Sequence, residues 1–265
     1  MTGQEMITHL RESVLDDVAA PPLWSDTELL RNLNYGEVQA CRRAQLIVDD
    51  ITANDNGTAS TAGTAGQKPL CTLAVIANQA TYNLSPKILQ VKRCQFSSMA
   101  YPIPGPVTYS ELDDLMAGWR GTAGTIGAAG TAGTITTVGT AGTTVTYYPT
   151  GFPAYFLNEP GNTITFVQAP ACNDTAYLVV SRIPLTPFTF STSPEIDEKY
   201  HEGIMDWAAH LAYMKNDSDT QNLNMAKLYE DKFIRQFGQL PDAYSDRMRK
   251  TLSQKQRMRP RVFGS

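Results

Sequence analysis

Helix-forming patterns lie at both ends of the chain, and strand-forming patterns lie between them. Apolar residues recur at helical spacing over 2–19 and 25–50, and again over 195–214 and 223–237. Between 69 and 183, short runs rich in β-branched and aromatic residues alternate with turn residues. Because each helix is apolar on one face only, packing the helices of both ends together buries those faces most economically. We therefore predict an α+β fold, in which a bundle of N-terminal and C-terminal helices carries an inserted antiparallel β domain.

These patterns divide the chain into five predicted segments. They are residues 1–53 for the first half of the helical bundle, 54–68 for a linker, 69–186 for the inserted β domain, 187–240 for the second half of the bundle, and 241–265 for an extended basic C-terminal arm. The predicted core of the bundle consists of apolar and aromatic residues on the inner helix faces: Leu30, Leu33, Ala44, Ile47, Tyr200, Ile204, Trp207, Leu211, Tyr229 and Phe233.

Several helix ends carry capping signals. Thr2 with Glu5, and Ser25 with Glu28, have the spacing of a capping box, in which each side chain binds a free backbone N–H group of the other residue. Gly238 follows the last helical pattern and is a typical helix C-cap. The stretch SELDDLMAG, within the β domain, predicts one short helix. The residues expected on the solvent face of the 25–50 helix are charged: Arg31, Glu37, Arg42 and Arg43.

A nine-residue repeat interrupts the β domain. GTAGT recurs at Gly121, Gly130 and Gly139. Residues 121–150 contain no Asp or Glu, which excludes the calcium-binding β-roll that a nine-residue period otherwise suggests. Thr, Ile and Val between the glycines favour extended β structure. Two alternatives stay open: a hairpin ordered by contact with neighbouring proteins, or a flexible, tolerated insertion. The contact candidates in the hairpin are Thr125, Thr134, Ile135, Thr143 and Val145.

The charge of the chain is unevenly spread. Its net charge is −4, but all 26 acidic residues and 15 of the 22 basic ones precede position 247, so residues 1–246 carry −11. The C-terminal arm carries the other basic residues together with apolar ones: Arg247, Arg249, Lys250, Lys255, Arg257, Arg259, Arg261, Val262 and Phe263. Such an arm suits phosphates, or an acidic groove on a protein. We favour the protein groove, because DNA contact alone does not require Val262 and Phe263.

No motif in the sequence points to catalysis, a metal or a cofactor. The four cysteines are scattered without a C-x-x-C pair, and we expect free, largely buried thiols in a reducing compartment. HEGIMDWAAH lacks the second histidine of a zinc protease, because Met205 stands at that position. Glu202 and Asp206 are four residues apart and are expected to form a solvated or interface face. The chain shows neither a signal peptide nor an apolar run of the ~20 residues that span a bilayer.

Six blocks of the sequence, in this order, resemble one protein family. They are WSDTELLRNLNYGEVQACRRAQLIVDD, NQATYNLSPKILQVKRC, SELDDLMAGWR, GFPAYFLNEPGNTITFVQAPA, YLVVSRIPLTP and PEIDEKYHEGIMDWAAHLAYMKNDSDTQ. The chain resembles the head-to-tail adaptor (connector) proteins of tailed, especially short-tailed, bacteriophages. The resemblance covers about residues 24–240, apart from the Gly/Thr segments. In the family pattern the WR and G-x-P-x-Y-F blocks are almost adjacent, so the repeat looks like an insertion, on the outer or tail-facing side of the adaptor.

The resemblance implies structural work in the virion. Such adaptors form a homo-oligomeric ring, typically of twelve copies, beneath the portal ring of the capsid. The ring extends the DNA channel and offers a platform to tail, nozzle or tail-fibre proteins, and the C-terminal segment clasps the portal. Genomic DNA would pass without sequence-specific binding during ejection, and the acidic excess of residues 1–246 suits a channel that must repel DNA. Synthesis in the bacterial host cytoplasm, without membrane contact, is expected.

Two other functions compete with the adaptor. One is a different virion or assembly-stage protein whose basic tail binds packaged DNA, which would show steep salt dependence. The other is a tail enzyme that degrades the cell wall, which needs a pair of carboxylates in a cleft. The sequence offers only generic Glu and Asp for that chemistry, so we predict that the protein is not an enzyme.

Overall fold

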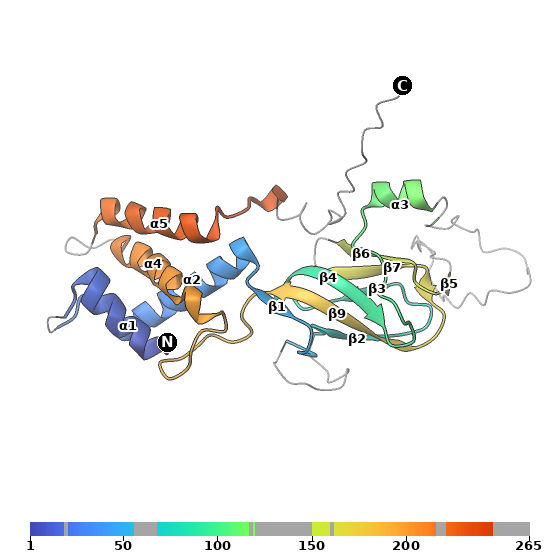
Figure 1. Cartoon of the computed structure of the whole chain (residues 1–265), viewed down its shortest axis with the longest axis horizontal. Coiled ribbons are helices and arrows are strands. Elements are labelled where there is room, and N and C mark those ends of the chain that lie inside the picture. The colour runs from blue at the N-terminus through green and yellow to red at the C-terminus, as the bar shows by residue number, and fades with distance from the viewer. Residues whose placement is uncertain are drawn as a thin grey trace, which may run out of the picture.

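The computed structural model describes residues 1–18, 21–55, 68–116, 119, 150–159, 162–215 and 221–245. Helices from both ends of the chain gather on one side of the molecule, and the strands lie on the other (Figure 1). The prediction of a mixed α+β fold with antiparallel sheets is confirmed.

The N-terminal helices begin where their caps predict and end earlier than expected. Helix α1, Gly3–Leu10, starts after Thr2, whose side chain forms the predicted capping box with Glu5. A π-helical turn, Arg11–Leu15, follows, and it ends because Asp16 adopts the left-handed conformation, with φ of 50°. Helix α2, Asp26–Ala44, starts after Ser25, whose hydroxyl accepts the N–H of Glu28.

The C-terminal end of α2 corrects the predicted helix over 25–50. Gln45 adopts a left-handed conformation with φ of 50°, and its N–H donates to the carbonyl oxygen of Cys41. The chain then extends into strand β1, Ile47–Asp49. Ala44 is therefore exposed at the helix end, and Ile47 belongs to a strand, where it packs half-buried against the edge of the helical core. Both were predicted inside the helical core.

The C-terminal helices match their patterns closely. A 3-10 turn, Glu198–Tyr200, leads into α4, His201–Tyr213, so this helix begins later than its predicted start at 195. Helix α5, Leu223–Phe237, has the predicted bounds and ends at Gly238, whose φ of 82° suits glycine.

Residues from both chain ends share one core. At the closest approach of α2 to α4, a Cβ added to Gly36 would lie 3.0 Å from Ile204 Cγ2. Side chains buried in the shared core include Met6, Ile7, Leu10, Trp24, Leu29, Leu33, Ile204, Ala208, Ala212 and Tyr229. Burying a leucine or phenylalanine there stabilises the fold by about 2 kcal/mol each.

Strand β9, Asp174–Arg182, organises the larger sheet. It pairs antiparallel with β4, Ile88–Phe96, over most of its length. Strand β1 pairs with the end of β9 that lies nearest the helices, and β2, Thr72–Val75, pairs with its other end. Because β1 leaves α2 directly and β9 leads back to α4, this sheet is joined to the helices at one end (Figure 1).

The smaller sheet packs against the larger one. It contains β3, Thr81–Asn83, β7, Thr163–Val167, and β6, Tyr155–Glu159, in that spatial order. Two-residue strands β5, Thr150–Gly151, and β8, Ala169–Pro170, form a short parallel pair. The side chains buried between the sheets include Val91, Cys94, Phe96, Phe156, Ile164, Phe166, Leu178 and Val180. Helix α3, Tyr109–Leu115, is the short helix that the sequence predicts.

Candidate functional site

Two of the three predicted residue sets lie outside the described residues. These are the portal-docking residues of the basic arm and the contact candidates of the nine-residue repeat. The basic set runs from Arg247 to Phe263, and the repeat set from Thr125 to Val145. Both stay predictions from the sequence.

Most of the third set, the predicted core of the bundle, is buried. Leu33, Ile204, Trp207, Tyr229 and Phe233 are buried between helices. The half-buried members of the set are Leu30, Tyr200 and Leu211, which pack against the same clusters. The exceptions are Ala44 and Ile47, whose positions are corrected above.

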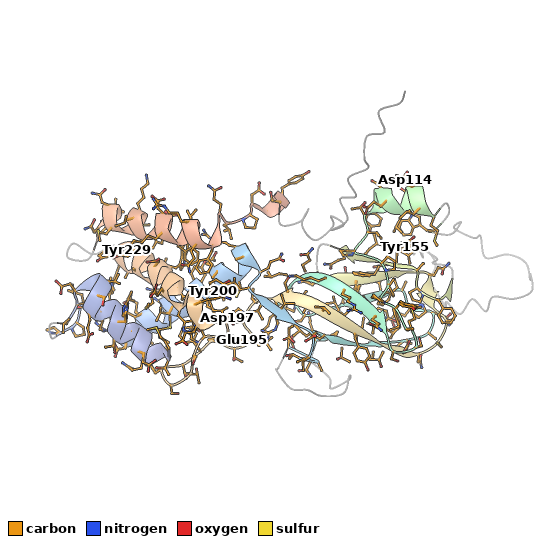
Figure 2. All side chains as sticks on the ribbon, viewed as in Figure 1. Asp114, Tyr155, Glu195, Asp197, Tyr200 and Tyr229 are labelled. Atoms are coloured by element: carbon orange, nitrogen blue, oxygen red, sulfur yellow. The ribbon has the colours of Figure 1, made fainter. Side chains whose placement is uncertain are left out.

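An arginine at the end of β9 connects the sheets to the helices. Arg182 is only 5% exposed, and its Nε donates to Asp49 Oδ2 of β1 at 2.7 Å. Its Nη2 donates to Glu195, which lies just before α4 (Figure 2). Burial alone would raise the pKa of Asp49, but N–H groups of Thr52 and Ile51 and the guanidinium lower it below its usual value. The Arg182 guanidinium thus binds the carboxylates of Asp49 and Glu195. We call these three residues the Arg182 joint.

A buried carboxylate of α2 completes this joint. Glu37 is 1% exposed, and its Oε1 accepts the backbone N–H groups of Glu195 and Ile196 at 2.6 and 3.3 Å. Burial raises the pKa of Glu37 to about 7, against the effect of those two hydrogen bonds, and the charge of Glu195 adds to the rise. The carboxylate therefore fixes the segment that enters α4, and it is held in an environment that favours protonation.

The burial of Glu37 predicts a specific pH dependence of stability. Its pKa is about 7 in the folded protein and 4.5 ordinarily, so the folded state holds the proton more tightly. The stability that Glu37 contributes is present below pH 4.5 and is lost as pH rises towards 7. Replacement by glutamine keeps an acceptor and removes the titration. We expect the stability of the Glu37→Gln variant relative to the natural protein to rise by about 3 kcal/mol from low pH to pH 8.

Urea unfolding at several pH values measures this difference. Comparing variant with natural protein cancels the contribution of other titrating groups, such as His201, whose pKa is lowered chiefly by burial. Glu12→Gln is the matched control, because Glu12 is exposed and the same charge is removed. A difference that stays constant with pH would show that folding does not raise the pKa of Glu37.

The predicted solvent exposure is wrong for two charged residues of α2. Glu37 and Arg43 were predicted on the solvent face of α2, and both are buried. Arg43 lies over the rings of Trp207 and Phe233, with its Cζ 5.0 and 4.9 Å from the ring centroids, and it donates to the carbonyl of Gly238. No local pattern marks these positions, because their partners come from segments more than 150 residues away. Arg182 and Asp49 were also missed, because they lie 133 residues apart in the sequence.

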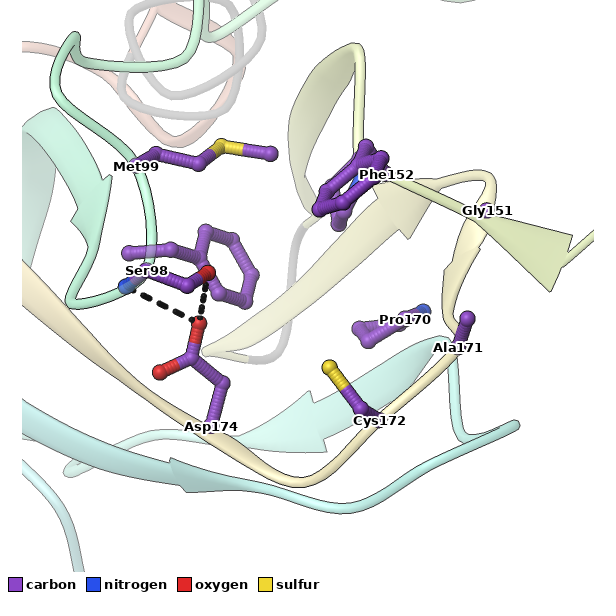
Figure 3. Close-up of a pocket in the computed structure, with 10 residues that line it drawn as sticks. Ser98, Met99, Gly151, Phe152, Pro170, Ala171, Cys172 and Asp174 are labelled. Carbon is purple, nitrogen blue, oxygen red and sulfur yellow. Dashed lines mark hydrogen bonds between the residues drawn. The ribbon is translucent and has the colours of Figure 1, made fainter.

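A small apolar hollow lies at the end of the sheets (Figure 3). Phe152 and Cys172 on its rim are exposed, and Phe152 is 72% exposed. The lining residues are Phe96, Ser98, Met99, Gly151, Phe152, Pro153, Pro170, Ala171, Cys172 and Asp174. Asp174 accepts hydrogen bonds from Ser97 and Ser98 and from the N–H of Thr175, so its carboxylate fixes the turn after β4. The hollow offers apolar contact area.

The described residues contain no cluster of His, Cys, Asp and Glu side chains that could hold a metal ion. His201 is buried against the carbonyl of Ile196, and the ring of His210 contacts the carbonyl of Ala226, so each has a structural partner. Burial raises the pKa of the Cys41, Cys71 and Cys94 thiols to about 12. Among the helices of the described ranges, none has the length and apolar composition to cross a membrane.

Comparison with known proteins identifies the family. A model of the SU10 adaptor protein family matches residues 1–261, which is nearly the whole chain. The chain belongs to the SU10 adaptor protein family. The resemblance in the sequence is thereby confirmed. This is a family of phage head-to-tail adaptors, structural components of the virion at the head–tail interface rather than enzymes. No curated protein matches the sequence.

Proposed function

We propose that the protein forms a ring, of about twelve copies by the family resemblance, beneath the portal ring of a phage capsid. The family match over residues 1–261 carries this proposal. Residues 1–53 and 187–240 would act as one helical body of each copy, and residues 69–186 as a β domain projecting from it. The shared helical core and the buried joint at Arg182 support a rigid connection between the two.

The C-terminal arm is proposed to dock into the portal. Between position 247 and the end of the chain there are seven basic residues and no acidic one, with apolar residues among them. A groove that is acidic and partly apolar would complement both features. The nine-residue repeat would contact a neighbouring copy or a tail protein, and the exposed apolar rim at Phe152 follows it directly in the chain.

The ring is proposed to extend the DNA channel and to present a platform to tail, nozzle or tail-fibre proteins. The net charge of −11 over residues 1–246 supports passage of DNA without binding, because like charges repel.

The experiment that tests the proposal is co-sedimentation of the full chain with purified portal rings. We expect the chain to sediment with the portal in an integral ratio of copies. A chain that stays in the supernatant at micromolar concentration would contradict the proposal.

A second candidate function rests on the same arm. The seven basic residues from Arg247 onward, with no acidic residue among them, could bind packaged DNA in a different virion protein. A DNA-binding arm with several phosphate contacts would lose about a thousandfold or more in duplex affinity between 50 and 200 mM salt. Portal docking should depend also on Val262 and Phe263. Measuring both affinities against salt concentration separates the two functions.

A further inference from the structure

We propose that neighbouring copies join head to tail, with the exposed face of α2 in one copy against a row of carboxylates on α4 in the next. This inference rests on the proposed ring and specifies its contact surfaces. Two oppositely charged faces of the helical part lie on opposite sides of the α2–α4 pair.

The first surface is the outer stripe of α2. Thr27, Arg31, Tyr35, Val38 and Arg42 follow one another at spacings of three or four residues and therefore share one face of the helix. All but the half-buried Val38 are exposed, and Tyr35 is 49% exposed. The stripe is about 16 Å long at 1.5 Å per residue from the first arginine to the second.

The two arginines of this stripe have no ionic partner within the described part of the chain. Neither Arg31 nor Arg42 makes an ion pair or side-chain hydrogen bond to another described residue, although Arg11, Arg43 and Arg182 each do. Tyr35, which is half-exposed and whose ring centroid lies 6.5 Å from that of Trp207, stands between these two arginines, and protein interfaces are richer in tyrosine and arginine than ordinary surface. The stripe carries no acidic residue, so its natural partner is a negatively charged face.

The second surface is the acidic row at the start of α4. Glu202 and Asp206 are four residues apart on α4, about 6 Å along the helix, and Glu198 lies four residues before Glu202 in the 3-10 turn that leads into α4. Glu198 and Glu202 are exposed, and Glu198 contacts the amine of Met1. Burial raises the pKa of half-buried Asp206; Lys232 of α5 opposes this rise, and Glu202 adds to it. A guanidinium from another copy would relieve the repulsion between Glu202 and Asp206.

The two surfaces face away from each other. Gly36 marks the side of α2 that meets α4, where Ile204 and Trp207 approach it. At 100° per residue, Arg31 lies about 140° and Arg42 about 120° around α2 from Gly36. By the same geometry, Glu202 and Asp206 lie roughly opposite Ile204 on α4. With a basic face on one side and an acidic face on the other, each copy can bind the next through a heterologous contact. Repeated contacts of this kind close into a ring when a whole number of copies completes a full turn.

Charge reversal tests the contact in the full chain assembled on portal rings. We expect Arg31→Glu with Arg42→Glu to reduce the fraction of chain in rings by more than about tenfold, because like charges across an interface cost several kcal/mol. Glu202→Arg with Asp206→Arg should have the same effect. A chain carrying all four changes should recover ring formation to within about twofold, and a one-to-one mixture of the two double variants should assemble as alternating copies. Mass photometry or native mass spectrometry gives the ring fraction and the alternation.

The matched control is Lys227→Glu with Arg235→Glu, which reverses two exposed charges on α5 outside both surfaces. Circular dichroism verifies that each variant is folded. If the natural chain forms rings but the reversals act no more strongly than the control, or if only the α2 reversal acts, the head-to-tail contact is wrong and the proposed ring stands. If the natural chain forms no ring on the portal, both the contact and the proposed function are overturned.

Discussion

A chain that ends at Pro241 is expected to fold normally and to lose stable binding to the portal ring. The last described core residue, Phe237, precedes this end, and Gly238 closes α5. Deleting 242–265 therefore removes no described residue of the helical core or of either sheet. The lost segment contains seven basic residues, and charge-assisted contacts of such an arm are worth about 1.5–3 kcal/mol each when they are made to charged groups. Even a few such contacts amount to more than a hundredfold in affinity.

The measurement is portal affinity by biolayer interferometry, together with the unfolding midpoint of the truncated chain. A full-length chain with Val262→Ser and Phe263→Ser serves as the partial control, since it keeps every charge of the arm. We expect it to bind at intermediate strength. Unimpaired portal binding by the truncated chain would show that the C-terminal arm is not needed for docking into the portal.

Replacement of Arg182 by methionine is expected to destabilise the protein by about 3 kcal/mol. The change leaves Asp49, whose side chain is 8% exposed, as a buried carboxylate without its cation. Asp49 still accepts N–H groups from Ile51 and Thr52, which limits the loss to the lower end of the range for broken buried pairs. Glu195, whose side chain is 34% exposed, can turn to solvent and contributes less.

Guanidinium unfolding of Arg182→Met gives this loss as a lower midpoint at an unchanged slope. The control is Lys199→Met, which breaks the ion pair with Asp197 at the surface and should leave the midpoint unchanged. A double variant, Asp49→Leu with Arg182→Met, should recover part of the loss, because it leaves no unpaired charge on Asp49. A single variant as stable as the control would show that the buried pair does not hold the joint.

Local patterns correctly predicted those elements in which the apolar spacing is repeated over several helical turns. The helix over 223–237 has its predicted bounds, and Thr2 and Gly238 cap their helices as expected. In these segments the residues that decide the structure are close in sequence.

The failures share one physical cause, which is burial by distant segments. The end of α2 depends on β1 pairing with β9, 133 residues further along, and no signal within 25–50 reports that pairing. Glu37 is a charged residue of the kind expected on a solvent-exposed face. It is buried because backbone N–H groups of the segment before α4 donate hydrogen bonds to it. The Arg182 joint was missed likewise, since Asp49 of β1 and Arg182 of β9 lie 133 residues apart and Glu195 belongs to the segment before α4. The roles of the C-terminal arm and of the nine-residue repeat stay predictions from the sequence.

The most direct test of the adaptor account is cryo-electron microscopy of the full chain mixed with its portal, with the chain alone as a comparison. The account predicts a ring of copies stacked on the portal, with residues 247–263 threaded into portal grooves. It also predicts that the α2 stripe of each copy meets Glu202 and Asp206 of the next. A chain that leaves the portal bare and instead coats duplex DNA would contradict the account and favour the DNA-binding function.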